Sequence, residues 1–133
     1  MKKESRFTAE KDEQLQKIRE LEKSNLQISS MFIIGFPSDN KETINNTINY
    51  AKYLNTTYPQ FSVWTPYPGT PVFNDYKNHI IAKKYEEFDQ YSLVYKLNRF
   101  DETQIRHYLD KAYSKYYSRF SWALKYFKSF ITA

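Results

Sequence analysis

Two short apolar runs separated by a helix-like pattern constrain the fold of this 133-residue chain more than any other feature. The first run, Met31–Ile34, contains no polar residue, which is typical of a strand buried on both faces of a parallel sheet. The second run covers residues 60–65. Four apolar residues between the runs recur at helical spacing: Ile44, Ile48, Ala51 and Leu54. We therefore expect residues 26–65 to form one β–α–β unit with parallel strands, in an α/β fold.

Capping patterns and further elements lie within this unit and on both sides of it. Asp39 and Glu42 have the spacing of a capping box, with Asp39 at the N-cap of the crossover helix. Asp101 and Gln104 repeat that spacing before the most regular helical pattern of the chain. Further elements are expected at Glu10–Lys23 (helix), Val72–Asn78 (short helix) and Leu93–Tyr95 (short strand). We divide the chain into a disordered terminus (1–9), an α/β part (10–78) and a helical extension (79–133).

The only two glycines, Gly35 and Gly69, each follow one of the apolar runs and have a proline close by. Glycine permits backbone angles and close approaches that other residues avoid. In parallel α/β folds, ligands bind at the edge formed by the carboxyl ends of the strands. We expect both glycines to line one concavity at that edge. The loop 65–71 is the stronger candidate, because three prolines stiffen it and Tyr67 offers a ring for stacking.

Both glycine loops also allow interpretations other than a ligand site at the edge of the sheet. The first loop also fits a simple strand-to-helix turn, although free amides at the start of the next helix would suit an anion. The second fits a rigid connector, or a Pro68–Pro71 ligand for a proline-binding module. His79 and His107 have no second ligand at metal-binding spacing. No nucleophile–base pair is recognisable, so the sequence predicts neither a metal site nor a catalytic residue.

From Lys111 onward the chain carries five basic residues and no acidic one, interleaved with aromatic residues. The first interpretation is a helix that packs on the core through Ile105, Leu109, Ala112 and Tyr116. Its cations, Lys111, Lys115 and Lys125, would then face solvent. A basic aromatic helix also suits an anionic membrane surface. Single-stranded nucleic acid is the least favoured partner.

Composition excludes several classes of protein. The absence of cysteine excludes disulfides, thiolate zinc sites and any iron–sulfur cluster held by this chain alone. No apolar run approaches the ~20 residues of a membrane span, and the charged start of the chain has no apolar core behind it. The expected compartment is the cytoplasm, with peripheral membrane contact as an extension of the basic-tail hypothesis.

Five segments together carry a family resemblance: Phe32–Pro37 (FIIGFP), Glu42–Ile44, Ala51, Gln60–Ser62 and Thr65–Pro71 (TPYPGTP). In this order they resemble the radical S-adenosylmethionine (SAM) enzymes. They are most similar to the branch with an upstream cobalamin-binding domain, the group of the Mg-protoporphyrin monomethyl ester oxidative cyclase. The resemblance covers about residues 10–133, and the ordered pair of loops is its most specific part.

The resemblance implies that residues 10–78 form the C-terminal part of a partial (β/α)6 barrel, with its fifth and sixth strands. It implies that the two loops border the SAM adenine and the substrate. The implied cofactor-binding residues are Gly35, Phe36, Pro37, Thr65, Pro66, Tyr67, Pro68, Gly69 and Thr70. Full-length members of the family use SAM and a 4Fe-4S cluster, and this branch adds cobalamin through a separate domain.

The chain departs from the family pattern in one decisive respect. The CxxxCxxC motif that holds the 4Fe-4S cluster has no counterpart, and the first four strands are missing. The chain thus resembles a C-terminal fragment that is inactive alone and depends on a separate chain carrying the cysteine half. The alternative is a small non-enzymatic module that binds a membrane surface or a protein through its basic aromatic helix. Whether the chain is an enzyme stays open on the sequence.

Overall fold

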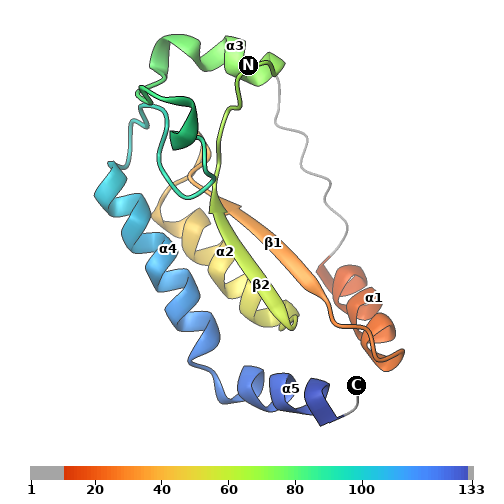
Figure 1. Ribbon diagram of the computed structural model, residues 1–133. Coiled ribbons are helices and arrows are strands. Elements are labelled where there is room, and N and C mark those ends of the chain that lie inside the picture. Colours follow the sequence, from red (N-terminus) through yellow and green to blue (C-terminus); the bar gives the residue numbers. More distant parts are fainter. Residues whose placement is uncertain (1–10, 132–133) are drawn as a thin grey trace.

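A two-stranded sheet with helices packed on one face forms the centre of the computed structural model, which describes residues 11–131 (Figure 1). The disordered terminus predicted for residues 1–9 lies outside the described residues. The elements are α1 (Lys11–Lys23), β1 (Ser29–Ile34), α2 (Lys41–Leu54), β2 (Tyr58–Val63), α3 (Pro71–Tyr76), the 3-10 helices η1 (Lys77–His79) and η2 (Tyr85–Glu87), α4 (Glu102–Tyr117) and α5 (Phe120–Ile131). None of the helices within residues 11–131 has the length and apolar character needed to cross a bilayer.

The predicted β–α–β unit is confirmed. Strands β1 and β2 pair in parallel, with Phe32 opposite Phe61 and Ile34 opposite Val63. Strand β2 begins and ends two residues earlier than the apolar pattern predicted. The carboxyl ends of both strands point toward α3, whereas α1 and α5 lie at their amino ends (Figure 1).

One hydrophobic cluster joins the sheet to α2 and α4. The helix-facing side of the strands carries Phe32, Ile34, Phe61 and Val63, all buried. Helix α4 buries the four residues that the sequence predicted, Ile105, Leu109, Ala112 and Tyr116. The predicted strand at Leu93–Tyr95 is reduced to one antiparallel bridge, Ile80 with Tyr95.

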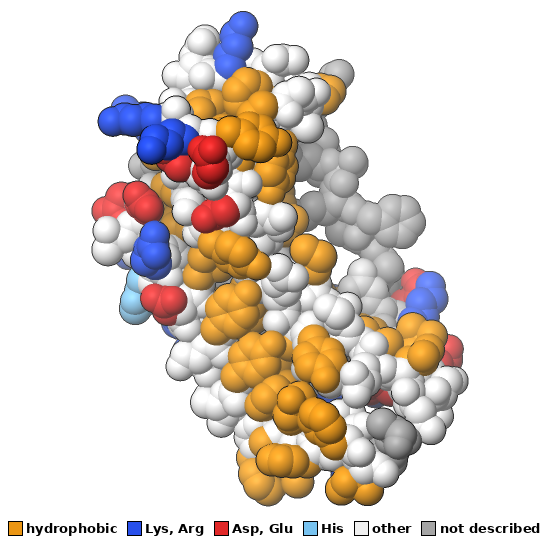
Figure 2. All heavy atoms as spheres, in the orientation of Figure 1, with side chains coloured by type: hydrophobic (Ala, Val, Ile, Leu, Met, Phe, Trp, Pro, Cys, Tyr) orange, Lys and Arg blue, Asp and Glu red, His pale blue; other side chains and the backbone are white. Residues whose placement is uncertain are grey.

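The prediction that Met31–Ile34 is buried on both faces is wrong. Met31 is 61% and Ile33 41% exposed, because no described helix covers the second face of β1. On the same face of β2, Ser62 is buried, and the side-chain amide of Gln60 donates to the Tyr91 hydroxyl at 2.8 Å. The uncovered apolar surface of the sheet therefore belongs to β1. Figure 2 shows apolar side chains spread over this side of the molecule, from the carboxyl ends of the strands down to α5.

The outer edge of β2 is closed by groups that are not part of any strand. The amide of Phe61 donates to the Tyr113 hydroxyl at 3.1 Å, and that hydroxyl donates to the Phe61 carbonyl at 3.0 Å. The Tyr117 hydroxyl donates to the Pro59 carbonyl, and the Val63 amide donates to the Gln90 carbonyl at 2.7 Å. The Val63 carbonyl accepts from the Thr65 hydroxyl. Every outward main-chain group from residue 59 to residue 63 is thus paired, and proline has no N–H to satisfy.

The outer edge of β1 is not paired by any residue within 11–131. The bonds from Tyr58 N to Ile28 O and from Trp64 N to Ile34 O show that the even-numbered residues of β1 face β2. The main-chain groups of Met31 and Ile33 therefore point outward. No residue in the described part of the chain binds those groups. The sheet can consequently be extended at β1 and is terminated at β2.

Candidate functional site at the carboxyl edge of the sheet

The two predicted loops leave the sheet at the same edge. Beyond the strands, the Trp64 amide still donates to the Ile34 carbonyl at 2.8 Å, so Gly35 and Trp64 lie side by side. From these two residues the chain continues into the loops 35–39 and 64–70. Parallel topology thus places both loops at one end of the molecule, as predicted.

Gly35 serves packing and backbone conformation. It is buried, its φ is +80°, and a Cβ there would lie 3.4 Å from Val63 Cγ1 and 3.5 Å from Ile105 Cδ1. Its carbonyl accepts a 2.6 Å hydrogen bond from the buried Tyr95 hydroxyl. The glycine therefore lets β1 turn sharply beneath the end of β2 and the start of α4.

Asp39 closes the turn that follows. Its amide donates to the Phe36 carbonyl at 2.9 Å, and its carboxylate accepts from the Phe36 amide at 3.0 Å. The other carboxylate oxygen accepts from the Thr43 hydroxyl at 2.9 Å. Only 4% of Asp39 is exposed, so these bonds compensate the burial of a carboxylate.

The predicted capping box of α2 is wrong by one residue. The N-cap is Asn40, whose side chain accepts from the amides of Glu42 and Thr43, and Thr43 replaces Glu42 as the reciprocal partner. Asp39 is not free to cap because it binds the Phe36 amide. The amides of Glu42 and Thr43 are occupied, so they do not form the free anion-binding set considered from the sequence.

The second loop is anchored at both ends and open at its tip. Pro66 is fully buried, and the Thr70 hydroxyl donates to the Tyr67 carbonyl at 2.7 Å while accepting from the Phe73 amide. Thr70 is thereby the N-cap of α3. Gly69 has φ +88° and no atom within 4 Å of an added Cβ. Unlike Gly35, it faces open space.

An aromatic cluster, Phe36, Trp64, Tyr76 and Tyr95, connects the two loops. The ring of Trp64 lies 5.9 Å from Phe36, 5.1 Å from Tyr76 and 5.0 Å from Tyr95, measured between centroids. Sequence reasoning missed Trp64, Tyr76 and Tyr95 as members of the site. Tyr95 is 60 residues from Gly35, and no local pattern signals such a contact.

Two hollows, of about 430 and 440 Å³, are lined by residues outside the predicted loops, although Tyr95 of the aromatic cluster lines the first. The first lies beside the start of α4, between Leu93 and Gln104. The second lies at the amino ends of the strands, between Glu22, Thr57 and Lys125. Neither glycine lines either hollow, so the predicted shared concavity stays a prediction. Within residues 11–131 no group of three or more potential metal ligands is found.

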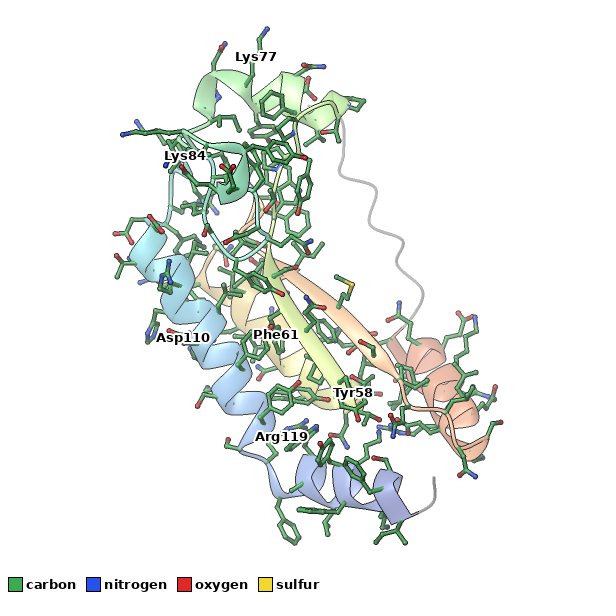
Figure 3. The ribbon with its side chains drawn as sticks, viewed as in Figure 1. Tyr58, Phe61, Lys77, Lys84, Asp110 and Arg119 are labelled. Carbon is green, nitrogen blue, oxygen red and sulfur yellow. The ribbon has the colours of Figure 1, made fainter. Side chains whose placement is uncertain are left out.

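The basic tail differs from the prediction that its cations face solvent. The Lys125 ammonium binds the Asn55 carbonyl and pairs with Glu22, and burial lowers the pKa of Lys125 against the opposing effect of Glu22. Lys111 donates to Asn45 Oδ1 at 2.8 Å. Arg119, in the link between α4 and α5 (Figure 3), lies over the Tyr116 ring and donates to the Lys52 carbonyl. These three cations attach the tail to the body of the protein; Lys115 is exposed.

Helix α5 instead exposes an apolar stripe. Its inner side packs through Trp122, whose indole N–H donates to the Thr57 carbonyl, and through Tyr126, whose ring meets Tyr58 edge to face. The helix exposes five large apolar residues, each between 47% and 83% exposed: Phe120, Leu124, Phe127, Phe130 and Ile131. The break between α4 and α5 lies at Ser118 and Arg119.

Comparison with known proteins yields partial matches to enzymes. No family model matches the chain. An uncharacterised methyltransferase of Pyrococcus horikoshii is 35% identical over 105 residues, covering 77% of this chain and 23% of the relative. The bacteriochlorophyllide d C-12(1)-methyltransferase of Chlorobaculum tepidum is 28% identical over 78 residues, 59% of this chain and 17% of the relative.

A third relative is the tRNA-2-methylthio-N(6)-dimethylallyladenosine synthase of Buchnera aphidicola, 40% identical over 65 residues, 49% of this chain and 15% of the relative. The chain thus spans less than a quarter of the length of each of these three relatives. The relatives include radical SAM-type enzymes, whose full-length forms use SAM and a 4Fe-4S cluster. The chain is therefore related to the radical SAM enzymes at the level of the superfamily.

Proposed function

We propose that this chain supplies the adenine and substrate side of a radical SAM barrel and is inactive alone. In this proposal β1 and β2 are the last two strands of a partial (β/α)6 barrel. The loops 35–37 and 65–70 border SAM, and a separate chain supplies the strands and the CxxxCxxC motif. We further propose that the chain belongs to the branch of these enzymes that binds cobalamin through a separate domain.

The observation that carries this proposal is the difference between the two edges of the sheet. Tyr113 and Tyr117 occupy the side of β2 on which a further strand would pair, so the sheet ends there. At β1 the outward groups of Met31 and Ile33 have no partner among the described residues. A terminal pair of strands in a larger sheet needs this asymmetry: one closed edge and one that accepts a strand.

The open face of β1 supports the same arrangement. Met31 and Ile33 expose apolar side chains on the side of the sheet opposite α2 and α4. In a barrel, the face away from the helices is the interior, which is filled by other side chains. Strands from a partner would cover this surface and pair with the edge of β1 at the same time.

The residues of this chain are suited to SAM and not to the 4Fe-4S cluster. Phe36, Pro37 and Tyr67 are half-buried, so each offers apolar or ring surface beside which a planar purine can lie. The 4Fe-4S cluster does not fit, since the sequence contains no thiolate ligand. The chain's own contribution would be to bind and orient SAM.

Complementation with a relative tests the proposal. The P. horikoshii methyltransferase would be produced without the 105-residue segment that matches this chain. It would then be mixed anaerobically with this chain, iron, sulfide and SAM under reducing conditions. We expect the two chains to co-elute and to form 5′-deoxyadenosine together, and neither to form it alone. Co-elution without SAM cleavage by a cluster-loaded mixture, or cleavage by this chain alone, would refute the proposal.

A proline substitution at the outer edge of β1 tests the strand pairing, and a threonine substitution at the same position is its matched control. Ile33→Pro removes an outward N–H that binds nothing within the described chain, so it should block an incoming strand with little change in the fold. Ile33→Thr alters the same exposed side chain but keeps that N–H. We expect the proline variant to lose the complex and the threonine variant to retain it.

The second candidate function is a non-enzymatic module that binds a protein through α5. The specific observation in its favour is the exposed stripe that includes Phe120 and Phe127. Because Lys125 and Arg119 point into the body of the protein, the charge pattern favours an apolar protein surface over an anionic membrane. If this is the function, Phe127→Ser should abolish binding to the partner while Ile33→Pro has no effect.

A further inference from the structure

We infer that Tyr95 and Asp39 are positioning residues that fix the Gly35–Phe36 peptide, and with it the loop bordering SAM. The inference rests on the proposed function and deepens it. It explains how a loop with a glycine at its start can present Phe36 in one orientation, and it assigns this task to two residues that would themselves touch no ligand.

The evidence is that both polar ends of one peptide unit are held. The carbonyl of Gly35 accepts from the Tyr95 hydroxyl at 2.6 Å, and the N–H of Phe36, on the other side of the same peptide, donates to the Asp39 carboxylate at 3.0 Å. Tyr95 is 1% and Asp39 4% exposed, so water does not replace either partner. A peptide plane bonded at both ends is prevented from rotating about its neighbouring dihedral angles.

Each holding residue is in turn held by the surrounding structure. Asp39 accepts from the Thr43 hydroxyl in the first turn of α2, at 2.9 Å. The ring of Tyr95 packs against Trp64, and its backbone is tied to Ile80 by the antiparallel bridge. The Gly35–Phe36 peptide is therefore connected to α2 on one side and to the segment 80–95 on the other.

This arrangement limits what the first loop can offer a ligand. The Phe36 amide and the Gly35 carbonyl are already bound, so this peptide has no free donor for a ligand. The loop would contact SAM through the side chains of Phe36 and Pro37, in the position set by the peptide. Loss of the Tyr95 hydroxyl should loosen that position without removing any ligand contact.

The test compares Tyr95→Phe with Tyr116→Phe. Both tyrosines are buried and each donates one 2.6 Å bond to a main-chain carbonyl, Tyr116 to that of Thr56 at the amino end of the sheet. Both variants should lose similar stability. In the full chain, hydrogen exchange of the Phe36 amide should become about fivefold faster, relative to core amides, in Tyr95→Phe only. Equal acceleration in the two variants would overturn the positioning role.

The second readout uses the complemented complex with S-adenosylhomocysteine as the probe. We expect Tyr95→Phe to raise its dissociation constant about fivefold and Tyr116→Phe to leave it unchanged. Equal affinities in wild type and Tyr95→Phe would overturn the inference while the proposed function stands. A wild-type complex that does not bind the probe would overturn both, even if the exchange data show the peptide to be clamped.

Discussion

The Tyr113 hydroxyl takes the place of a neighbouring strand at Phe61, accepting from its amide at 3.1 Å and donating to its carbonyl at 3.0 Å. The ring also meets Phe61 edge to face at 5.3 Å. A single side chain from α4 thus performs the hydrogen bonding of one residue of a β-ladder. Figure 3 marks Phe61 on β2, beside this helix.

Tyr113→Phe should therefore lower the free energy of unfolding by about 1–3 kcal/mol, because both main-chain groups of Phe61 lose a partner. Urea denaturation would measure the loss. Tyr108→Phe on the same helix is the control, since its hydroxyl makes no hydrogen bond to a described residue. Equal effects of the two substitutions would show that Tyr113 contributes only its ring.

Alanine substitutions at the two glycines should distinguish a packing role at Gly35 from a purely conformational role at Gly69. Gly35→Ala forces a side chain to φ +80° and into contact with Val63 and Ile105, and we expect a loss of about 2 kcal/mol. Gly69→Ala adds its methyl group to open space and bears only the cost of φ +88°, about 1 kcal/mol. Thermal or urea unfolding would rank the variants, and a greater loss at Gly69 would contradict the packing role of Gly35.

Stability should fall as pH rises above 10.0, in part through Tyr116. Burial raises the pKa of this phenol above its ordinary value of 10.0. At a pH between the ordinary pKa and the raised pKa of the folded state, the phenol is ionised in the unfolded chain and protonated in the folded chain. Folding then takes up a proton, so the free energy of unfolding falls as pH rises. Urea midpoints on both sides of pH 10.0 would measure the slope. Tyr116→Phe should make the slope shallower, and an unchanged slope would contradict this assignment.

Recovery with lipid vesicles should not depend on anionic lipid. Three of the five cations of the basic tail, Lys111, Arg119 and Lys125, bind groups of the protein itself, which weakens the attraction of the tail to a negative surface. Flotation with neutral and with anionic vesicles would compare the two cases. Stronger recovery with anionic vesicles, reduced by Lys115→Gln, would restore the membrane-surface hypothesis.

The parallel pairing could be predicted because strand, crossover and strand each leave a local pattern in the sequence. The exposure of Met31 and Ile33 could not. An uninterrupted apolar run indicates that both faces will be covered, and it does not say whether this chain supplies the cover. Adjacent Asp39 and Asn40 are both good caps, and the choice between them depends on the Phe36 amide. The contact between Tyr95 and Gly35 could not be predicted, because the strand-like pattern at Leu93–Tyr95 does not indicate which distant residue the segment meets.

Closure of β2 by tyrosine hydroxyls also sets the stoichiometry of any sheet built on this chain. Growth is possible in one direction only, so a continuous sheet can contain this protein once at each end and never in its middle. A complex with a strand donor would stop at one donor per chain unless the donor itself carries a second free edge. Two copies of this chain alone could share a sheet only by joining β1 to β1, which limits edge-to-edge self-assembly to a dimer.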